Sequence, residues 1–392
     1  MVKKNGKYVF NSDLSTVKKI STNITMSTVT TLNEFKEFFQ VPSVVYQDDE
    51  YWVPPFWIET RDFFRRRNPF WTHAEIRLFI ARKNKSVVGR IAAIIDYTFC
   101  EINQKNIGFF GFFECIQDYD IASELFTVAE EWLSSKGMSV MYGPINGRVD
   151  IGCGFLFYGF NSSPSILSSY SPKYYLKFSE RFGMKKSRDQ FTYYLDLSKP
   201  TPDELKKEAK QCEAKGIKIR KFNRLQTHKD MNLWITLMME TFSEHWGFIP
   251  VSSEEIKMRF GVNKLRWFVD TKLFLFAEVD KKPIAFQWSN PDYNQVFKKM
   301  NGTLGGIEII KFLIDKRKIN QGKFDIIGCK KEFRNKSIAS LMNYYSIIEM
   351  KKRGYKGIEI GWVDEHNTAS LRIMEKMGAK LCKKFRVYEK II

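Results

Sequence analysis

The sequence has few of the residues that build metal centres and disulfide frameworks. It contains six cysteines, at positions 100, 115, 153, 212, 329 and 382, with no Cys-x-x-Cys pair, and four histidines with no His-Glu-x-x-His spacing. Disulfide-stapled secreted domains and zinc sites depend on such spacings. The sequence therefore predicts a protein of a reducing compartment without a metal site.

Long apolar runs are also missing. No stretch approaches the roughly 18 apolar residues that a membrane helix needs. The first residues are charged and polar, whereas a signal peptide has an apolar segment there. We therefore expect a cytoplasmic protein.

Blocks of one charge sign are short, although the chain is strongly basic. The 63 Lys and Arg against 44 Asp and Glu give a net charge of +19. A nucleic-acid-binding arm has longer basic blocks, so the pattern argues against nucleic acid as a partner. Three alternatives stay open: a solvated basic face, a phosphate-bearing ligand such as coenzyme A, and peripheral contact with an anionic membrane.

One stretch of the sequence occurs twice. "FFGFFECIQDYDIAS" at 109–123 matches "IIGCKKEFRNKSIAS" at 326–340, 217 positions later. Two apolar pairs that read as β-hairpins, at 78–90 and 274–286, lie only 196 positions apart, and an amphipathic segment at 305–318 accounts for the difference as an inserted helix. Since 392 residues exceed the roughly 250–300 at which one core stops growing, a duplicated domain is expected.

Each half predicts a β-hairpin, a strand, a helix and a further strand. The segments after the hairpins are 106–115, 120–137 and 139–145 in the first half, and 323–329, 337–354 and 357–363 in the second. Within 364–380 a helix is predicted that has Asn367 as N-cap and Gly378 as stop, and a closing strand after it completes the second half. The predicted fold class is α/β, with a mixed, mostly antiparallel sheet that contains one parallel strand-helix-strand unit.

The boundary between the halves is predicted within "DLSKPTPDEL" at 196–205, where two prolines precede a new helix. The predicted organisation is a polar N-terminal segment over 1–27, a first domain over 28–200 and a second domain over 201–392.

The loop before the repeated helix differs between the two copies. In the second copy the chain passes from the strand through Arg334 and Lys336 into the helix, whose first N–H groups are free to bind an anion. In the first copy Asp118 and Asp120 stand there. An aspartate caps the helix itself and repels phosphate. The sequence thus predicts an anion-binding loop in the second copy, against the alternative of two ordinary capped helices.

These motifs resemble the GNAT acyltransferase superfamily. Residues 334–339, "RNKSIA", are similar to its signature of Gln or Arg, two residues, Gly, one residue and Gly or Ala, with Ser337 in place of the first Gly. "EHNTASLRIMEKMGAK" resembles the superfamily's Asn-initiated helix. "WVPPF", "NPFW", "VGRIAAIID", "GFFGFFE" and "MYGPIN" resemble a tandem-GNAT family, whose first copy is degenerate here. The resemblance implies two tandem GNAT-like domains.

The resemblance also implies an activity: N-acyl transfer from acyl-CoA to an amine by direct attack on the thioester, with long-chain amines among the suggested acceptors. Acyl-CoA is then a co-substrate, and no cofactor is bound covalently. The residues implied to bind it are Cys329, Arg334, Asn335, Lys336, Ser337, Ile338, Ala339 and Asn367. Cys329 would contribute its backbone N–H, and no sequence neighbour activates it as a nucleophile.

The catalytic acid and base stay open. The position where many GNAT enzymes have a tyrosine acid is Met374, so Glu365, Tyr388 and Glu114 are the catalytic candidates, with His366 beside Glu365. Each also has a structural reading, as a loop residue, a strand residue or an ion-pair partner.

Two other function classes remain. A tandem-GNAT aminoacyltransferase would use charged tRNA, although no long helical arm is visible in the sequence. A catalytically silent module that binds acyl-CoA or a membrane is the second, because Met374 cannot donate a proton and the chain is basic.

Overall fold

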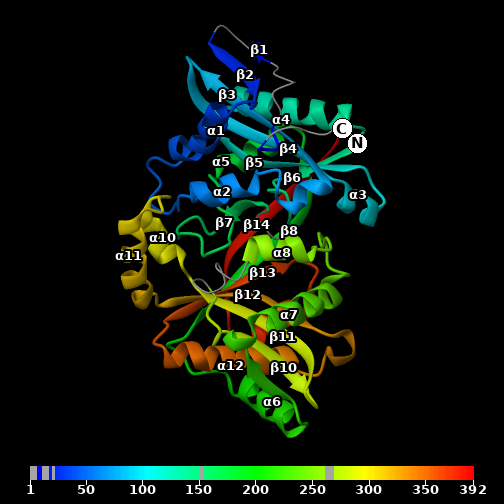
Figure 1. Ribbon diagram of the computed structural model, residues 1–392, viewed down its shortest axis with the longest axis vertical. Coiled ribbons are helices and arrows are strands. Elements are labelled where there is room, and N and C mark those ends of the chain that lie inside the picture. The colour runs from blue at the N-terminus through cyan, green and yellow to red at the C-terminus, as the bar shows by residue number, and fades with distance from the viewer. Residues whose placement is uncertain (1–6, 11–16, 20–22, 150–152, 261–268) are drawn as a thin grey trace. The chain divides into compact units, whose positions relative to one another are not determined.

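The computed structural model describes residues 7–10, 17–19, 23–149, 153–260 and 269–392 (Figure 1). The chain forms two compact units. Unit 1 consists of Met1–Asp189, Phe297–Ile310 and Phe385–Ile392, and unit 2 of Gln190–Val296 and Lys311–Lys384. None of the helices in the described segments combines the length and apolar character needed to cross a bilayer.

The sheet of unit 1 is antiparallel except at one pair. Its strands are β1 (Val17–Lys19), β2 (Ile24–Thr28), β3 (Ala74–Lys83), β4 (Ser86–Asp96), β5 (Ile107–Cys115), β6 (Val140–Gly143) and the end of β14 (Lys380–Ile391), in that order. Among the pairs of these strands in the described residues, β5 and β6 run parallel and the others antiparallel, and β14 pairs β6 from Tyr388↔Gly143 to Ile391↔Val140. A two-residue turn joins β3 to β4 at Asn84 and Lys85, both with positive φ, as such hairpins require.

The helices of unit 1 cover this sheet. They are α1 (Leu32–Val45), α2 (Trp57–Phe63), α3 (Tyr97–Asn103), α4 (Tyr119–Ser135) and α5 (Tyr174–Arg181), with a short strand β7 (Phe155–Tyr158) before α5. Ile121, Leu125 and Phe126 of α4 pack on Phe110 and Phe113 of β5 in one buried cluster. Helix α4 is thus the crossover between the parallel strands β5 and β6.

The sheet of unit 2 repeats the arrangement. Its order is β9 (Lys218–Lys221), β10 (Phe274–Val279), β11 (Lys282–Pro291), β12 (Gln321–Cys329), β13 (Gly357–Asp364) and β8 (Lys185–Asp196, whose residues 190–196 belong here). In the part of this sheet that the structure describes, β12 and β13 run parallel and the other pairs of this order antiparallel. The turn between β10 and β11 again has two positive-φ residues, Asp280 and Lys281.

Helices lie on both faces of the unit 2 sheet. Helix α7 (Thr227–Phe242) packs on Phe274, Phe286 and Trp288, with α8 (Ser253–Phe260) beside it. Helices α6 (Asp203–Ala214), α12 (Ile338–Lys352) and α13 (Thr368–Met377) cover the other face, and α6 lies alongside α12 (Figure 1). Helices α10 (Asn294–Met300) and α11 (Gly306–Asp315) follow β11.

The predicted mixed α/β architecture is confirmed. Both hairpins, the strand-helix-strand unit of each half and the inserted helix at 305–318 are present, the last as α11. Asn367 caps α13, and Gly378 ends it with φ 69°. The domain limits stay a prediction, although β2 starts at Ile24, ahead of the predicted start at 28. Residues 190–196 belong to unit 2 and 385–391 to unit 1, which the repeat did not predict.

Candidate functional site

Strands β12 and β13 diverge partway along their length. Their parallel pairing runs from Gln321↔Gly357 to Phe324↔Ile360 and then stops. Beyond that point β12 pairs only with β11 and β13 with β8. Residues 325–329 and 361–364 therefore face each other without a ladder between them, and we call this opening the fork.

Backbone alternation points one donor into the fork. The N–H of Lys330 donates to the carbonyl of Ile284 in β11, at 2.9 Å. Since successive N–H groups of a strand point to opposite sides, the N–H of Cys329 points away from β11 and toward β13. This is the donor that the sequence resemblance assigned to the thioester carbonyl.

The loop after β12 enters α12 without a side-chain cap. Asn335 and Ser337 have left-handed backbone conformations, with φ 60° and 58°. A left-handed residue is where glycine is favoured, which explains why the GNAT signature has Gly at the position of Ser337. No side chain of the loop caps α12, so the N–H groups of its first turn are available to an anion.

The cations of this loop are held by the end of α7. Arg334 donates from Nη2 to the carbonyl of Thr241 at 3.0 Å, and its Nη1 lies 3.6 Å from Glu244. Lys331 also pairs with Glu244, at 3.0 Å. Lys336 is exposed and lies over the ring of Phe333, 5.1 Å from its centroid. The loop thus presents Lys336 to solvent, while Arg334 is anchored.

The corresponding helix of unit 1 is capped, as predicted. Asp118 accepts from the N–H of Asp120 at 3.2 Å and of Ile121 at 3.5 Å. Its other carboxylate oxygen binds Lys83 at 3.0 Å. A carboxylate therefore occupies the position that an anion would take in unit 1.

The remaining predicted coenzyme residues lie in unit 2. Ile338 is buried under α12, while Ala339 and Asn335 keep surface in solvent. The side chain of Asn367 accepts from the N–H of Ser370 at 3.1 Å as the cap of α13. Burial raises the pKa of the Cys329 thiol to about 11, so it stays protonated at neutral pH. This agrees with a role for Cys329 through its backbone alone.

The three predicted catalytic residues do not lie in one unit. Glu365 follows β13 in unit 2, and its Oε1 lies 3.8 Å from His366 Nε2. Tyr388 is buried in unit 1 and donates to Glu180 at 3.1 Å. Glu114 accepts from Tyr175 at 2.8 Å and lies 3.8 Å from Arg90, both in unit 1, and burial raises its pKa to about 7. Their catalytic roles stay predictions.

The sequence interpretation missed Asp325, which begins the fork. It is the extra residue of a β-bulge, since β11 pairs Trp288↔Ile326 and then Ser289↔Phe324. Asn290 donates to its Oδ2 at 2.7 Å. Its Oδ1 is buried without a hydrogen-bond partner in the described part of the chain. Burial raises the pKa of Asp325 to about 7, against the opposing effect of Lys323.

A buried ion triad lies next to Asp325. Lys323 Nζ lies 3.3 Å from Glu359 Oε1, and Lys383 Nζ lies 2.6 Å from Glu359 Oε2. The two lysine side chains are 2% and 3% exposed. The triad holds two lysine cations and one carboxylate, so it carries a net positive charge. An unbalanced charge in a buried site is costly, and this favours the ionised form of the nearby Asp325.

His245 was also missed as a site residue. His245 comes shortly after the end of α7, close enough to the loop of Arg334 for the charge of Arg334 to act on it. Burial lowers the pKa of His245, the charge of Arg334 lowers it further, and Asp364 at the end of β13 acts in the opposite sense. The imidazole is thus neutral at pH 7 beside the outer end of the fork. No sequence motif marked Asp325 or His245; the bulge and the end of α7 bring them to the fork.

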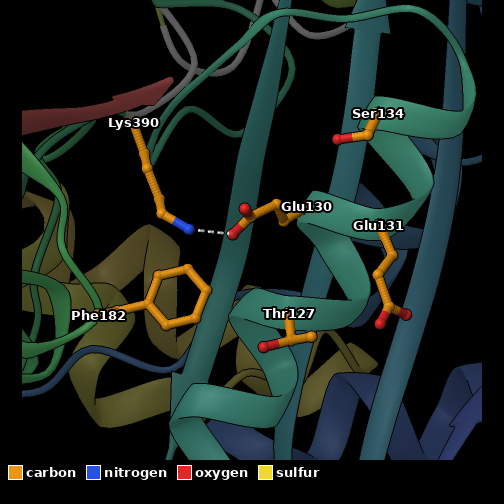
Figure 2. Close-up of a pocket in the computed structure, with 6 residues that line it drawn as sticks. All are labelled: Thr127, Glu130, Glu131, Ser134, Phe182 and Lys390. Atoms are coloured by element: carbon orange, nitrogen blue, oxygen red, sulfur yellow. Dashed lines mark hydrogen bonds and ion pairs between the residues drawn. The ribbon is translucent and has the colours of Figure 1, made fainter. Parts of the chain in front are cut away.

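A surface hollow in unit 1 has a different character. It is lined by Thr127, Glu130, Glu131, Ser134, Phe182 and Lys390. Figure 2 shows Lys390 reaching across to Glu130, with which it forms an ion pair, and Lys390 also lies 4.3 Å from the ring centroid of Phe182. Its cation is engaged and two glutamates line it, so the hollow is unsuited to a pyrophosphate.

Known proteins match nearly the whole chain. It is 27% identical over 366 residues to protein YghO of Escherichia coli K12, covering 92% of this chain and 93% of that protein. It is 27% identical over 382 residues to a bacterial ceramide synthase of Caulobacter vibrioides, covering 95% and 99%. No family model matches the sequence.

Solved structures show the same fold at low sequence identity. A tandem GNAT protein from the clavulanic acid biosynthesis pathway has a TM-score of 0.55 at 9% identity, covering 94% of this chain and 98% of that one. An N-acetyltransferase from Sphaerobacter thermophilus has a TM-score of 0.52 at 12% identity, covering 95% and 97%.

Proposed function

From its tandem GNAT fold, we propose that this chain is an acyl-CoA-dependent N-acyltransferase whose coenzyme site lies in unit 2. One observation supports the proposal most strongly: the fork is followed directly by the uncapped start of α12, and the loop of Arg334 and Lys336 connects the two. A thioester needs a slot beside a free backbone donor, and its pyrophosphate needs unpaired N–H groups. In unit 1 Asp118 fills the helix start, and just past the β5–β6 ladder the N–H of Ile145 still donates to the carbonyl of Phe110 at 2.8 Å.

The coenzyme is proposed to bind along the fork. Its pyrophosphate would accept from the first N–H groups of α12, at Ile338 and Ala339, with Lys336 adding charge. Its thioester carbonyl would accept from the N–H of Cys329. That donor also stabilises the oxyanion that forms when the amine attacks, which makes it more effective in the transition state than in the ground state.

Asp325 is proposed as the general base. An ammonium group cannot attack a carbonyl carbon, so a proton must leave the acceptor nitrogen before or during bond formation. The Oδ1 of Asp325 is free, lies at the start of the fork and belongs to a carboxyl whose pKa is raised to about 7. A base with a pKa near the working pH combines an ionised form with a useful affinity for the proton. The new N–C bond forms as the C–S bond to the coenzyme thiolate breaks, and the proposed donors of a proton to that thiolate are Glu365 and His366 of unit 2.

The acceptor class is proposed from one relative. A ceramide is a long-chain amino alcohol acylated on nitrogen, and the Caulobacter relative is named a ceramide synthase. We therefore propose a long-chain amine as acceptor and a fatty acyl-CoA as donor.

Coenzyme release tests the function. Purified protein is mixed with palmitoyl-CoA or acetyl-CoA and with sphinganine, a short amine or no amine, and free thiol is followed with a chromogenic disulfide while mass spectrometry identifies the amide. We expect amine-dependent thiol release and an N-acyl product with palmitoyl-CoA and sphinganine. If the protein binds acyl-CoA tightly but releases no coenzyme thiol with any amine, it is a binding module and not an enzyme of this kind. If product forms only with charged tRNA, the donor is an aminoacyl-tRNA and not acyl-CoA.

A further inference from the structure

Helix α11 exposes a stripe of isoleucines. Ile307, Ile310 and Ile314 are 67%, 60% and 57% exposed. Their spacing of three and four residues places them on one side of the helix. Phe312 is 6% exposed and its ring lies 5.8 Å from that of Tyr293, so the other side of α11 is packed on the protein.

A further apolar side chain precedes this stripe. Leu304, just before the helix, is 42% exposed. Large apolar side chains scattered singly on a surface are ordinary, but a contiguous group is a mark of a binding surface.

Basic side chains flank the stripe. Residues 294–318 hold six Lys or Arg and two Asp or Glu. Lys311 is exposed within the helix, and Lys316, Arg317 and Lys318 follow directly. One of the two acidic residues, Asp315, is already paired with Lys318 at 2.8 Å. The isoleucine stripe thus lies within a positive patch.

We propose that this surface, made of Leu304, Ile307, Ile310 and Ile314 with Lys311 and the basic residues 316–318, binds an anionic membrane. An interfacial helix buries its apolar side at the boundary of headgroups and acyl chains while basic residues contact anionic lipids. With ten residues, α11 is too short to cross the bilayer and would lie in its plane.

The charges decide between a membrane and a second copy of the chain as the partner. A symmetric dimer through α11 would bring two basic patches together, and like charges at an interface oppose association. An anionic lipid surface complements them. The proposal does not depend on the proposed reaction, because membrane binding is measured without acyl-CoA.

Vesicle sedimentation tests the proposal. The full chain is mixed with sucrose-loaded vesicles of phosphatidylglycerol and phosphatidylcholine in equal parts, or of phosphatidylcholine alone, at low and high salt. We expect binding to the anionic vesicles that weakens with salt. Replacing residues 316–318 by Gln removes three charges worth about fivefold each, so affinity should fall roughly 100-fold.

The isoleucines provide the second variant. The triple substitution I307S/I310S/I314S should also lower affinity roughly 100-fold, since it removes most of the apolar area available for insertion. Leu225→Ser is the matched control, because Leu225 is 96% exposed on another element and should leave binding unchanged. Unfolding temperatures of all variants should stay close to that of the unaltered protein, because every replaced side chain is exposed except Lys316, which is half-buried.

Three outcomes would overturn the proposal. The first is no binding to anionic vesicles. The second is equal binding by the isoleucine variant, which would place the membrane surface elsewhere. The third is a concentration-dependent dimer that the isoleucine variant abolishes while vesicle binding is unaffected, which would assign α11 to self-association.

Discussion

Replacing Asp325 by Asn removes a proton acceptor and keeps the shape of the side chain. The amide can still accept from Asn290 through its oxygen, as Oδ2 does now at 2.7 Å. If Asp325 is the general base, turnover should fall by about 100- to 10,000-fold, the range for a positioned base. The Michaelis constant for acyl-CoA should stay within about twofold, because the proposed pyrophosphate contacts are at α12 and do not involve Asp325. Stopped-time assays of thiol release measure both quantities.

The pH dependence gives a second readout. The Asp325 carboxyl must be ionised to act, and its pKa is raised to about 7. The kcat/KM of the unaltered enzyme should therefore rise with pH up to about 7 through this group, and the variant should lack that limb. Asp280→Asn is the matched control, since Asp280 is an exposed carboxylate of unit 2 in the turn between β10 and β11.

As the pH rises toward 7, the stability of the unaltered protein should fall through Asp325 while its activity rises. The folded-state pKa of Asp325 lies above its ordinary value of 3.8, so the folded protein binds more protons than the unfolded chain between about pH 4 and 7. The free energy of unfolding then falls as the pH rises through this window. Three pKa units correspond to about 4 kcal/mol, an upper bound on the stabilisation of the Asn variant at pH 8.

Denaturant unfolding at pH 5 and pH 8 measures this effect. The gap in stability between the variant and the unaltered protein should widen from pH 5 to pH 8. Normal turnover in the Asn variant would refute the assignment of Asp325 as base. A stability gap that does not change with pH would refute the raised pKa on which the assignment rests.

Three further predictions concern the two helix starts. Arg334→Ala with Lys336→Ala should raise the Michaelis constant for acyl-CoA about five- to a hundredfold with little change in turnover, because each partly exposed contact contributes about 0.5–1.5 kcal/mol in ground and transition states alike; loss of turnover alone would make the loop catalytic. Ser337→Gly should raise the free energy of unfolding by roughly 0.5–1 kcal/mol in thermal melts, since Gly adopts φ 58° without strain. Asp118→Ala should cost about 1 kcal/mol as a lost cap and leave acyl-CoA kinetics unchanged, and a change in the Michaelis constant would place coenzyme in unit 1.

The repeat made much of the fold predictable. Hairpin turns, strands and crossover helices follow from apolar periodicity and local turn chemistry, so both copies could be aligned before the structure was known. Asp118 was predictable as a cap because capping is a local interaction. The partner of the last strand was not predictable: residues 388–391 pair with β6, more than 240 positions away, and no local pattern specifies that partner.

The sequence pointed to the loop that we propose binds the coenzyme but not to the proposed base, and the reason is physical. A helix start is defined by consecutive residues, so Arg334 to Ala339 could be recognised from their order alone. The role of Asp325 depends on a bulge that shifts β12 by one residue against β11, which turns its carboxylate to the side of Asn290. If "KFDIIGC" is taken as a regular strand, nothing in the sequence identifies Asn290 as the partner of Asp325. The bulge places its Oδ1 at the point where β12 and β13 separate, and this separation is set by pairing to β11 and β8 on either side. A base positioned in this way is a property of the whole sheet of unit 2, which is why the pH profile of Asp325→Asn tests the fold of the fork as well as its chemistry.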